Sequence, residues 1–245
     1  MPDIAVPVAP NTRVKTLLDM VRRCAFECGV SKDPVNQIES VVDSTEDVGR
    51  ITGWVISAWR DIQDLEKNWK FMRRSCSFVT VAGQFQYTAL QCGITDNTFG
   101  RWDLHTFRNY LTAGGVNGEM LMDDLDYDTW RNIYQLGSYR NVTTRPFVVT
   151  EMPDLSLGLG PTPLVGYTVI GDYYASPRDL DADTEEPVLN ERHNRMGIVG
   201  KAMMEYGGSE GAPEVYARGD KMYKSFISRL RRDELPAIRW GGPLA

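Results

Sequence analysis

The fold is decided in the stretch GWVISAWRDIQDLEKNWKFM (residues 53–72) and in SFVTVAGQFQY (residues 77–87), which follows it closely. In the first segment apolar side chains recur every three or four residues, which predicts an amphipathic helix from about Thr45 to Asn68. In the second segment apolar and polar residues alternate, and two such runs separated by Gly83 predict a pair of strands joined as a hairpin. The chain therefore changes from helical to β-rich near residue 73.

The residues before this stretch also have helical spacing. A series of apolar residues three or four positions apart predicts a helix that begins near Asn11 or Thr12 and ends at Gly29. Prolines interrupt the first residues of the chain, which predicts an extended arm over residues 1–11. We therefore expect residues 12–73 to form a helical part.

Residues 74–182 are expected to form a β-rich insert. Short strand-like runs alternate with turn signals, including the Gly-Pro-Thr-Pro turn at residues 160–163. The segment DYDTWRNIYQL, residues 126–136, predicts a brief helix among them. Aromatic and aliphatic residues alternate over residues 166–174, as in strands packed on two sides, so an antiparallel sandwich or small barrel fits best.

Residues 183–235 return to helical spacing and are expected to complete the helical part. One helix is predicted over residues 189–206, ended by Gly207-Gly208. A second begins at Pro213 and ends before Pro236, and residues 236–245 follow as a C-terminal tail.

Two glycines in the first of these helices, Gly197 and Gly200, lie one turn apart and indicate close contact with another helix. Helical segments at both ends of the chain enclose the β-rich residues. We therefore predict an α+β fold in which N- and C-terminal segments form a helical bundle and the middle of the chain forms an inserted antiparallel β-sandwich or barrel-like module.

The composition excludes several classes of protein. The 245 residues include 27 Lys and Arg against 33 Asp and Glu, a formal charge of −6, and 42% of the residues are hydrophobic. These values are ordinary for a globular chain and argue against disorder and against a freestanding nucleic-acid binder, which is usually basic. No apolar run approaches the roughly 18 residues of a membrane-spanning helix, and the N-terminus lacks the pattern of a signal peptide.

Motifs for catalysis and for metal binding are missing from the sequence. There is no Gly-x-Ser-x-Gly elbow, no phosphate-binding glycine loop and no His-Glu-x-x-His pair. Cys24 and Cys28 lie one helical turn apart, as two metal ligands can, but they continue an apolar series, so we expect them in the core. The sequence thus predicts no catalytic site, no cofactor and no metal.

Several long segments resemble a known family. The opening stretch resembles the N-terminal signature of bacteriophage head–tail adaptor, or connector-completion, proteins, which are related in role to tail tubular protein A. Four further segments are similar to that family in the same order: LDYDTWRNIYQLG, LSLGLGPTP, GYTVIGDYYASPRDLDADTEEPVLNERHN and KAMMEYGGSEGAPEVYARGDKMYKSFISRLRRDELP. The resemblance covers the chain from about residue 45 to residue 236.

The resemblance implies a structural protein of the virion, made in the host cytoplasm. It implies a homo-oligomeric ring, typically of twelve copies, that docks on the portal protein and completes the connector. Such a ring is the platform for a downstream tail or nozzle protein, and genomic DNA leaves through its axial channel without sequence-specific binding. The family brings no catalytic residue with it.

Charged surfaces are candidates for the contacts of such a ring, in which one face of a copy meets a different face of its neighbour. We expect an acidic run in the β-rich insert to pair with a basic run on the last helix. The candidates are Asp123, Asp124, Asp126 and Asp128 on one side and Arg229, Arg231 and Arg232 on the other. We further expect Trp240, in the tail, to anchor the chain in a groove of the portal protein.

Two other functions stay open from the residues alone. A tail component that hydrolyses peptidoglycan would need a pair of carboxylates, for which the candidates are Glu151, Asp154 and Asp172. A tail-tube, nozzle or receptor-binding protein would account for the β-rich insert but not for the large helical segments.

Overall fold

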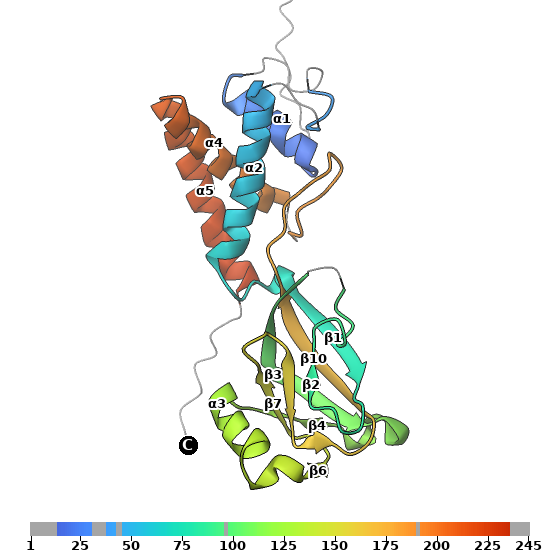
Figure 1. Ribbon diagram of the computed structural model, residues 1–245. Coiled ribbons are helices and arrows are strands. Elements are labelled where there is room, and N and C mark those ends of the chain that lie inside the picture. The colour runs from blue at the N-terminus through green and yellow to red at the C-terminus, as the bar shows by residue number, and fades with distance from the viewer. Residues whose placement is uncertain (1–13, 31–37, 43–45, 96–97, 190–191, 236–245) are drawn as a thin grey trace, which may run out of the picture. The chain divides into compact units, whose positions relative to one another are not determined.

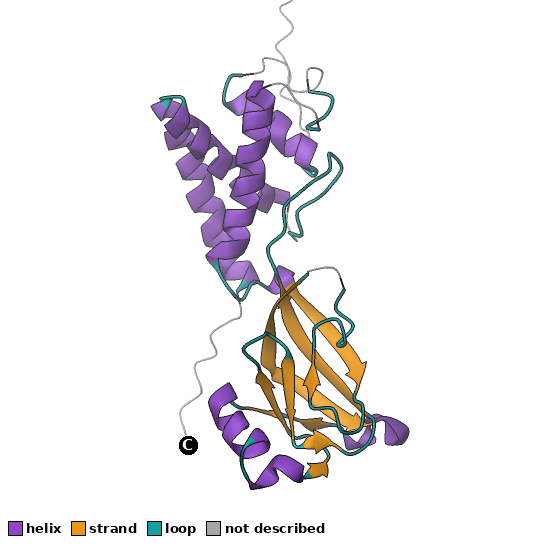
Figure 2. Ribbon diagram, in the orientation of Figure 1, coloured by secondary structure: helices purple, strands orange, loops and turns teal. Residues whose placement is uncertain are grey.

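The structure is a computed structural model that describes residues 14–30, 38–42, 46–95, 98–189 and 192–235. Its mixture of helices and largely antiparallel sheets confirms the predicted α+β class (Figure 2). The chain divides into two compact units (Figure 1), which we call the helical unit and the β-unit. The helical unit comprises residues 1–71 and 178–245, and the β-unit comprises residues 72–177.

Two of the predicted segments cannot be compared with the structure. The N-terminal arm, residues 1–11, and the C-terminal tail, residues 236–245, lie outside the described residues. The tail includes Trp240, the candidate portal anchor.

Among the described residues of the helical unit, four α-helices pack on one another. They are α1 (Leu17–Glu27), α2 (Glu46–Leu65), α4 (Arg195–Ser209) and α5 (Pro213–Glu234). The last two pack closely along their lengths, and both α1 and α2 pack on α4 (Figure 1). The N-terminal and C-terminal segments of the chain therefore share one core.

Helix α1 begins later than the sequence predicts. The Thr16 hydroxyl accepts a hydrogen bond from the backbone N–H of Asp19, and the Asp19 carboxylate accepts one from the backbone N–H of Thr16. This capping box satisfies N–H groups that have no partner inside the helix. The predicted start near Asn11 or Thr12 is therefore wrong at Val14 and Lys15, which precede the cap and are not helical.

Helix α2 matches its prediction over most of its length but ends at Leu65 instead of Asn68. Its apolar residues Ile51, Val55 and Ile62 are at most 1% exposed. Beyond the helix the chain folds back, and the indole N–H of the fully buried Trp69 donates to the Ile62 carbonyl at 2.8 Å. The tryptophan thus covers a carbonyl that the helix end would otherwise leave without a partner.

Glycines bring α4 and α5 close together, as predicted. A β-carbon on Gly219 would lie 2.6 Å from the carbonyl oxygen of Gly200, and one on Gly200 would lie 3.0 Å from that of Gly219. Neither helix has room there for a larger residue. A β-carbon on Gly197 would also lie 3.3 Å from the Cβ of Phe226.

Both predicted ends of α4 are wrong. The helix begins at Arg195, after a 3₁₀ turn, and not near Leu189. It also continues through Gly207 to Ser209. A β-carbon on Gly207 would lie 2.6 Å from the backbone nitrogen of Tyr216, so this glycine permits close packing on α5 and does not end the helix.

The β-unit consists of two four-stranded sheets and one two-stranded sheet. The first sheet contains, in order, β1 (Arg73–Val79), β10 (Tyr167–Ala175), β3 (Phe99–Leu111) and β4 (Met120–Leu121). The second contains β2 (Gln86–Tyr87), β8 (Leu157–Gly160), β7 (Val148–Glu151) and β5 (Asp123–Asp124). The third pairs β6 (Thr143–Thr144) with β9 (Thr162–Pro163).

The predicted hairpin between the first two strands is wrong, because β1 and β2 belong to different sheets. Strand β1 pairs with β10 over its whole length, and β2 pairs with β8. Phe78 of β1 and Tyr87 of β2 instead meet in the core, with ring centroids 5.0 Å apart. Two short pairs, β5 with β7 and β6 with β9, are parallel and depart from the predicted antiparallel pattern.

A shared core fills the space between the two larger sheets. It combines residues of the first sheet, such as Phe107 and Val169, with residues of the second, such as Leu157 and Leu159, and these four are 0% exposed. The alternation of buried and exposed residues along β1 follows from this packing, since only one face of that strand meets the core.

Candidate functional site

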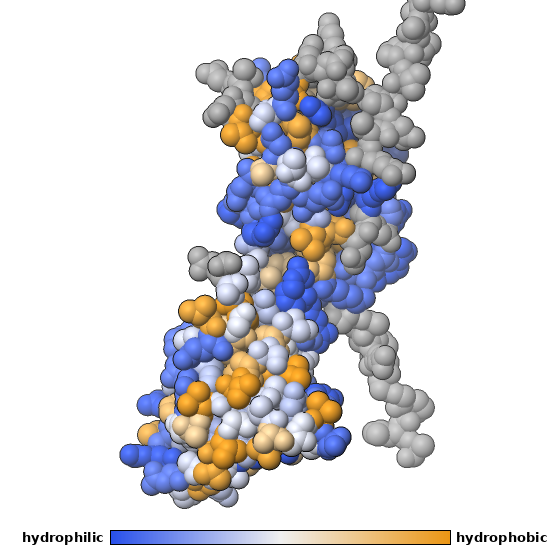
Figure 3. Space-filling view, turned by 90° about the vertical axis from the view of Figure 1, so that its right-hand side faces the viewer, coloured by the Kyte–Doolittle hydropathy of each residue, from blue (hydrophilic) through white to orange (hydrophobic). Residues whose placement is uncertain are grey.

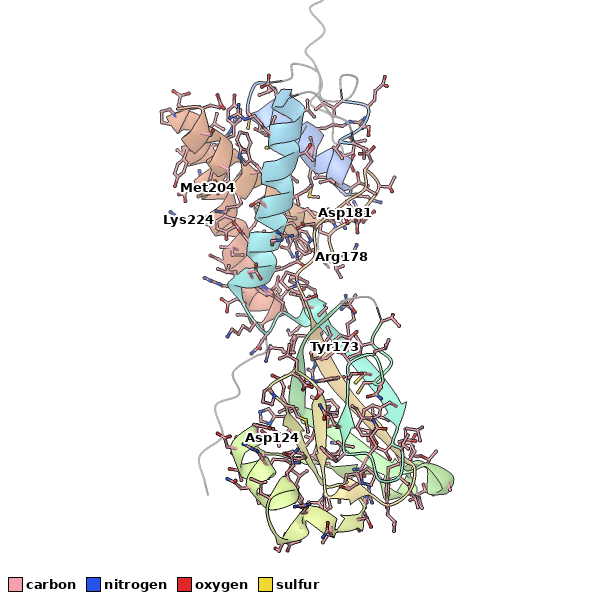
Figure 4. All side chains as sticks on the ribbon, in the orientation of Figure 1. Asp124, Tyr173, Arg178, Asp181, Met204 and Lys224 are labelled. Atoms are coloured by element: carbon pink, nitrogen blue, oxygen red, sulfur yellow. The ribbon has the colours of Figure 1, made fainter. Side chains whose placement is uncertain are left out.

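The acidic run lies in the β-unit, on β5 and at the start of α3 (Tyr127–Trp130), and its four carboxylates are exposed. Asp124 lies beside α3 (Figure 4), 3.0 Å from Nδ1 of the exposed His105. Asp126 caps α3, because its carboxylate accepts the backbone N–H of Thr129 at 2.9 Å, and this bond lowers the pKa of Asp126. The run is therefore an exposed acidic surface in which some members also have a local structural role.

The basic run lies on α5, in the helical unit, and is already engaged within the chain. The Arg231 guanidinium pairs with Glu66 at 3.0 Å, and that of Arg232 with its neighbour Asp233 at 3.1 Å. The Arg229 guanidinium lies 5.8 Å from the centre of the Phe226 ring. Lys224 projects outward from the same helix (Figure 4) and pairs with Asp220 at 2.8 Å. These contacts are exposed, so each contributes little to stability.

The three carboxylates considered for glycoside hydrolysis have separate local roles. The Glu151 carboxylate accepts the backbone N–H of Trp102 at 3.3 Å, and that of Asp172 pairs with Arg73 at 2.8 Å. The Asp154 carboxylate accepts hydrogen bonds from Ser156, which lower its pKa. A general acid needs a raised pKa, so Asp154 is unsuited to that role.

Cys24 of α1 and Cys28, which caps the C-terminal end of this helix, lie side by side, as their spacing implies. The sulfur atoms of Cys24 and Cys28 are 3.9 Å apart, and both side chains are buried. Their hydrogen bond and burial raise the pKa of Cys24, whereas the same hydrogen bond and the nearby Arg218 lower that of Cys28. Within the described ranges no group of three His, Cys, Asp or Glu side chains is placed to hold a metal ion.

A cleft in the β-unit was not predicted. It has a volume of about 410 Å³ and lies between the loop that follows β2 and the turn that joins β7 to β8. Its lining includes Leu90, Phe99, Asp154 and Leu155. Sequence patterns do not reveal it, because its lining combines residues within 88–99 with residues 154–156, which are distant in the chain.

A second, smaller pocket of about 170 Å³ lies in the helical unit, between α2 and the end of α4. The Arg50 guanidinium lies 5.1 Å from the centre of the Trp54 ring and pairs with Glu210. Trp54 in turn meets Tyr206 edge to face, with ring centroids 5.8 Å apart. The arginine is thus held between an aromatic ring and a carboxylate.

The β-unit also exposes many apolar residues on its surface. Figure 3 shows that hydrophobic residues gather on the face of the β-unit turned to the viewer. One exposed group follows α3, where Leu136, Tyr139 and Phe147 are exposed. Exposed apolar clusters of this kind mark surfaces that other molecules cover. In the part of the chain that the structure describes, no helix is long and apolar enough to cross a bilayer.

Comparison with known proteins gives one family. A family model described as "SU10 adaptor protein" matches residues 14–245, which span both units. No curated protein matches the chain.

Proposed function

The chain belongs to the SU10 adaptor protein family, and from this membership we propose that it is a structural adaptor at the head–tail junction of a bacteriophage virion. The observation that carries the proposal is the extent of the match, which includes the helical unit and the β-unit together. The separate local roles of Glu151, Asp154 and Asp172 agree with a structural role.

We propose further that twelve copies form a ring that docks on the portal protein, completes the connector and carries the next tail or nozzle protein. Twelve copies at −6 each carry −72 formal charges. An acidic wall repels phosphates, whereas a lysine-rich wall would bind them by releasing counterions. This balance suits a channel through which genomic DNA slides without being held.

Mass measurement and negative-stain imaging of the protein, alone and mixed with portal protein, test the proposal. The expected result is a ring of about twelve copies on the portal. A six-fold ring, a fibre trimer or a protein that does not bind the portal would contradict it.

The charged runs are proposed to meet between neighbouring copies of this ring. Arg232 carries the sharper test, because its side chain is 74% exposed and its partner Asp233 is adjacent in sequence. We expect the double change Arg231→Glu and Arg232→Glu to weaken ring assembly. The matched control is Lys224→Glu, which reverses a charge on the same helix; equal assembly of all three proteins would exclude the contact.

The tail is proposed to bind the portal through Trp240. A chain truncated after Leu235 should keep its fold, because the deletion begins beyond α5, yet fail to bind portal protein. The change Trp240→Ala in the full chain tests the contribution of this side chain alone, with the rest of the tail kept. Normal portal binding by the truncated chain would rule out this role.

A further inference from the structure

The turn between β7 and β8 holds a leucine in a backbone conformation that favours glycine. Leu155 has a φ of 63°, and among the described residues it is the one non-glycine residue with positive φ. Its N–H donates to the Met152 carbonyl at 2.8 Å, and its own carbonyl accepts the indole N–H of Trp102 at 2.9 Å. The conformation is thus fixed from both sides, although a β-carbon is crowded in it.

Burial of the Leu155 side chain in the core does not offset this strain. It is 49% exposed and lines the cleft of about 410 Å³, together with Leu90, which is 70% exposed, and Phe99. Asp154 gives the rim a negative charge, and its carboxylate is held by the Gln86 amide at 2.9 Å. A bulky apolar side chain kept in a strained, exposed turn is explained if a partner covers it.

A second apolar surface projects from the same unit after α3. We call residues 136–140 the projecting segment, in which Leu136 and Tyr139 are 62% and 53% exposed. The side chains of Arg140, in the segment, and of Arg131, which precedes it, are also exposed. Tyrosine and arginine are the residue types that most often anchor protein interfaces.

The projecting segment directly follows residues that pack on the sheet, and its Tyr139 ring meets the ring of Tyr134 with centroids 6.1 Å apart. Trp130, 1% exposed, and Tyr134 lie over Gly160 of β8. A β-carbon on Gly160 would lie 2.7 Å from the Tyr134 ring and 2.8 Å from Nε1 of Trp130, so only glycine leaves room for these rings. An anchored segment loses little conformational freedom when it binds a partner.

The two surfaces are complementary. The cleft is lined by apolar side chains such as Leu90 and Leu155 together with polar ones, and Asp154 places a carboxylate at its rim. The projecting segment exposes apolar side chains together with the Arg140 guanidinium. In Figure 1, α3 lies at the left of the β-unit and the loop after β2 lies at its right. A closed ring needs two different, matching faces on each copy.

We propose that the projecting segment of one copy docks into the cleft of the next copy, with Tyr139 against Leu90 and Leu155 and with Arg140 near Asp154. The inference rests on the proposed ring, since the ring supplies the neighbouring copy. It adds to the proposed contact of the charged runs a second contact between copies, made by the β-units alone, and gives Leu155 its role.

The variant Leu155→Gly tests the proposal, because it removes both the side chain and the backbone strain. The isolated protein should unfold at an equal or higher denaturant concentration, while the protein concentration needed for half-maximal ring assembly rises at least tenfold. The matched control is Leu164→Ala, which truncates a leucine that is 55% exposed and lies outside the cleft lining. The control should assemble like the unmodified protein.

A second variant, Tyr139→Ala, tests the other face. It should weaken assembly as Leu155→Gly does. The double variant should assemble no worse than the weaker-assembling of the two single variants, because both changes remove the same contact. An equal mixture of the two single variants retains one intact contact for each pair of copies. It should therefore give dimers and no closed rings.

The outcomes separate the inference from the proposed function. Normal ring assembly by both single variants, or additive losses in the double variant, would overturn the inference and leave the adaptor proposal standing. Normal ring assembly by Leu155→Gly with loss of portal or tail-protein binding would assign the cleft to that other partner and also overturn it. An unmodified protein that forms no ring, alone or on the portal, would refute the ring itself.

Discussion

The helical unit and the β-unit differ in what they leave exposed. In the helical unit, backbones of α4 and α5 approach each other at glycines, and exposed charges such as Arg231 find partners within the unit. The β-unit, residues 72–177, contains no lysine, and most of the large apolar side chains that are exposed among the described residues belong to it. Lysine is depleted at protein interfaces and apolar patches mark them, so the comparison supports the proposal that copies meet through the β-unit.

The largest effects are expected from two of the buried tryptophans, Trp69 in the helical unit and Trp130 in the β-unit. Trp69 and Trp130 are at most 1% exposed. Changing either to alanine should lower the free energy of unfolding of its unit by about 3–5 kcal/mol, since large side chains leave large cavities. Hydrogen exchange followed by mass spectrometry should show lost protection mainly in the helical unit for Trp69→Ala and in the β-unit for Trp130→Ala.

Each tryptophan variant is the control for the other. If both variants lose protection equally throughout the chain, the two units unfold together. The helical unit and the β-unit would then not differ in stability.

A smaller effect is expected at the contact between α4 and α5. A β-carbon on Gly219 would lie 2.6 Å from a backbone oxygen, so Gly219→Ala should destabilise the helical unit by about 1–3 kcal/mol in a denaturant titration. The matched control is Gly208→Ala, because Gly208 lies within α4 with no atom within 4 Å of an added β-carbon.

The control should gain about 0.5–1 kcal/mol, because alanine restricts the unfolded chain more than glycine does. Equal losses at the two positions would mean that helix propensity, and not the close contact, decides the stability of this unit.

The smallest effect is expected in alkaline solution. Burial raises the pKa of the Cys76 thiol, in the β-unit, from 9.0 to about 11. Between these values the unfolded chain loses the thiol proton and the folded chain keeps it, so the stability of the β-unit should fall as the pH rises from 9 to 11. The variant Cys76→Ala should show a shallower fall in denaturant titrations across this range; identical slopes would exclude a contribution from Cys76.

The candidate contact surfaces were only partly visible in the sequence. The acidic and basic runs are local patterns and were found directly. The pairing of Arg231 with Glu66 was not, because these residues are far apart in the chain and only folding brings them together. No sequence pattern predicted the cleft or the conformation of Leu155. Leucine does not indicate a positive φ as glycine does.

The sequence by itself determined the type of most elements: the helices α2 and α5, the brief helix at α3 and the strands β7, β8 and β10 follow from local spacing and turn residues. Only the tertiary structure decided which strands pair and where close packing replaces a helix end. Strand β1 pairs with β10, about one hundred residues away, and not with β2, because both β1 and β2 bury one face in the core between the sheets. Gly207 similarly lies within α4 and does not end it. The position is glycine because Tyr216 of α5 occupies the space that a side chain would need.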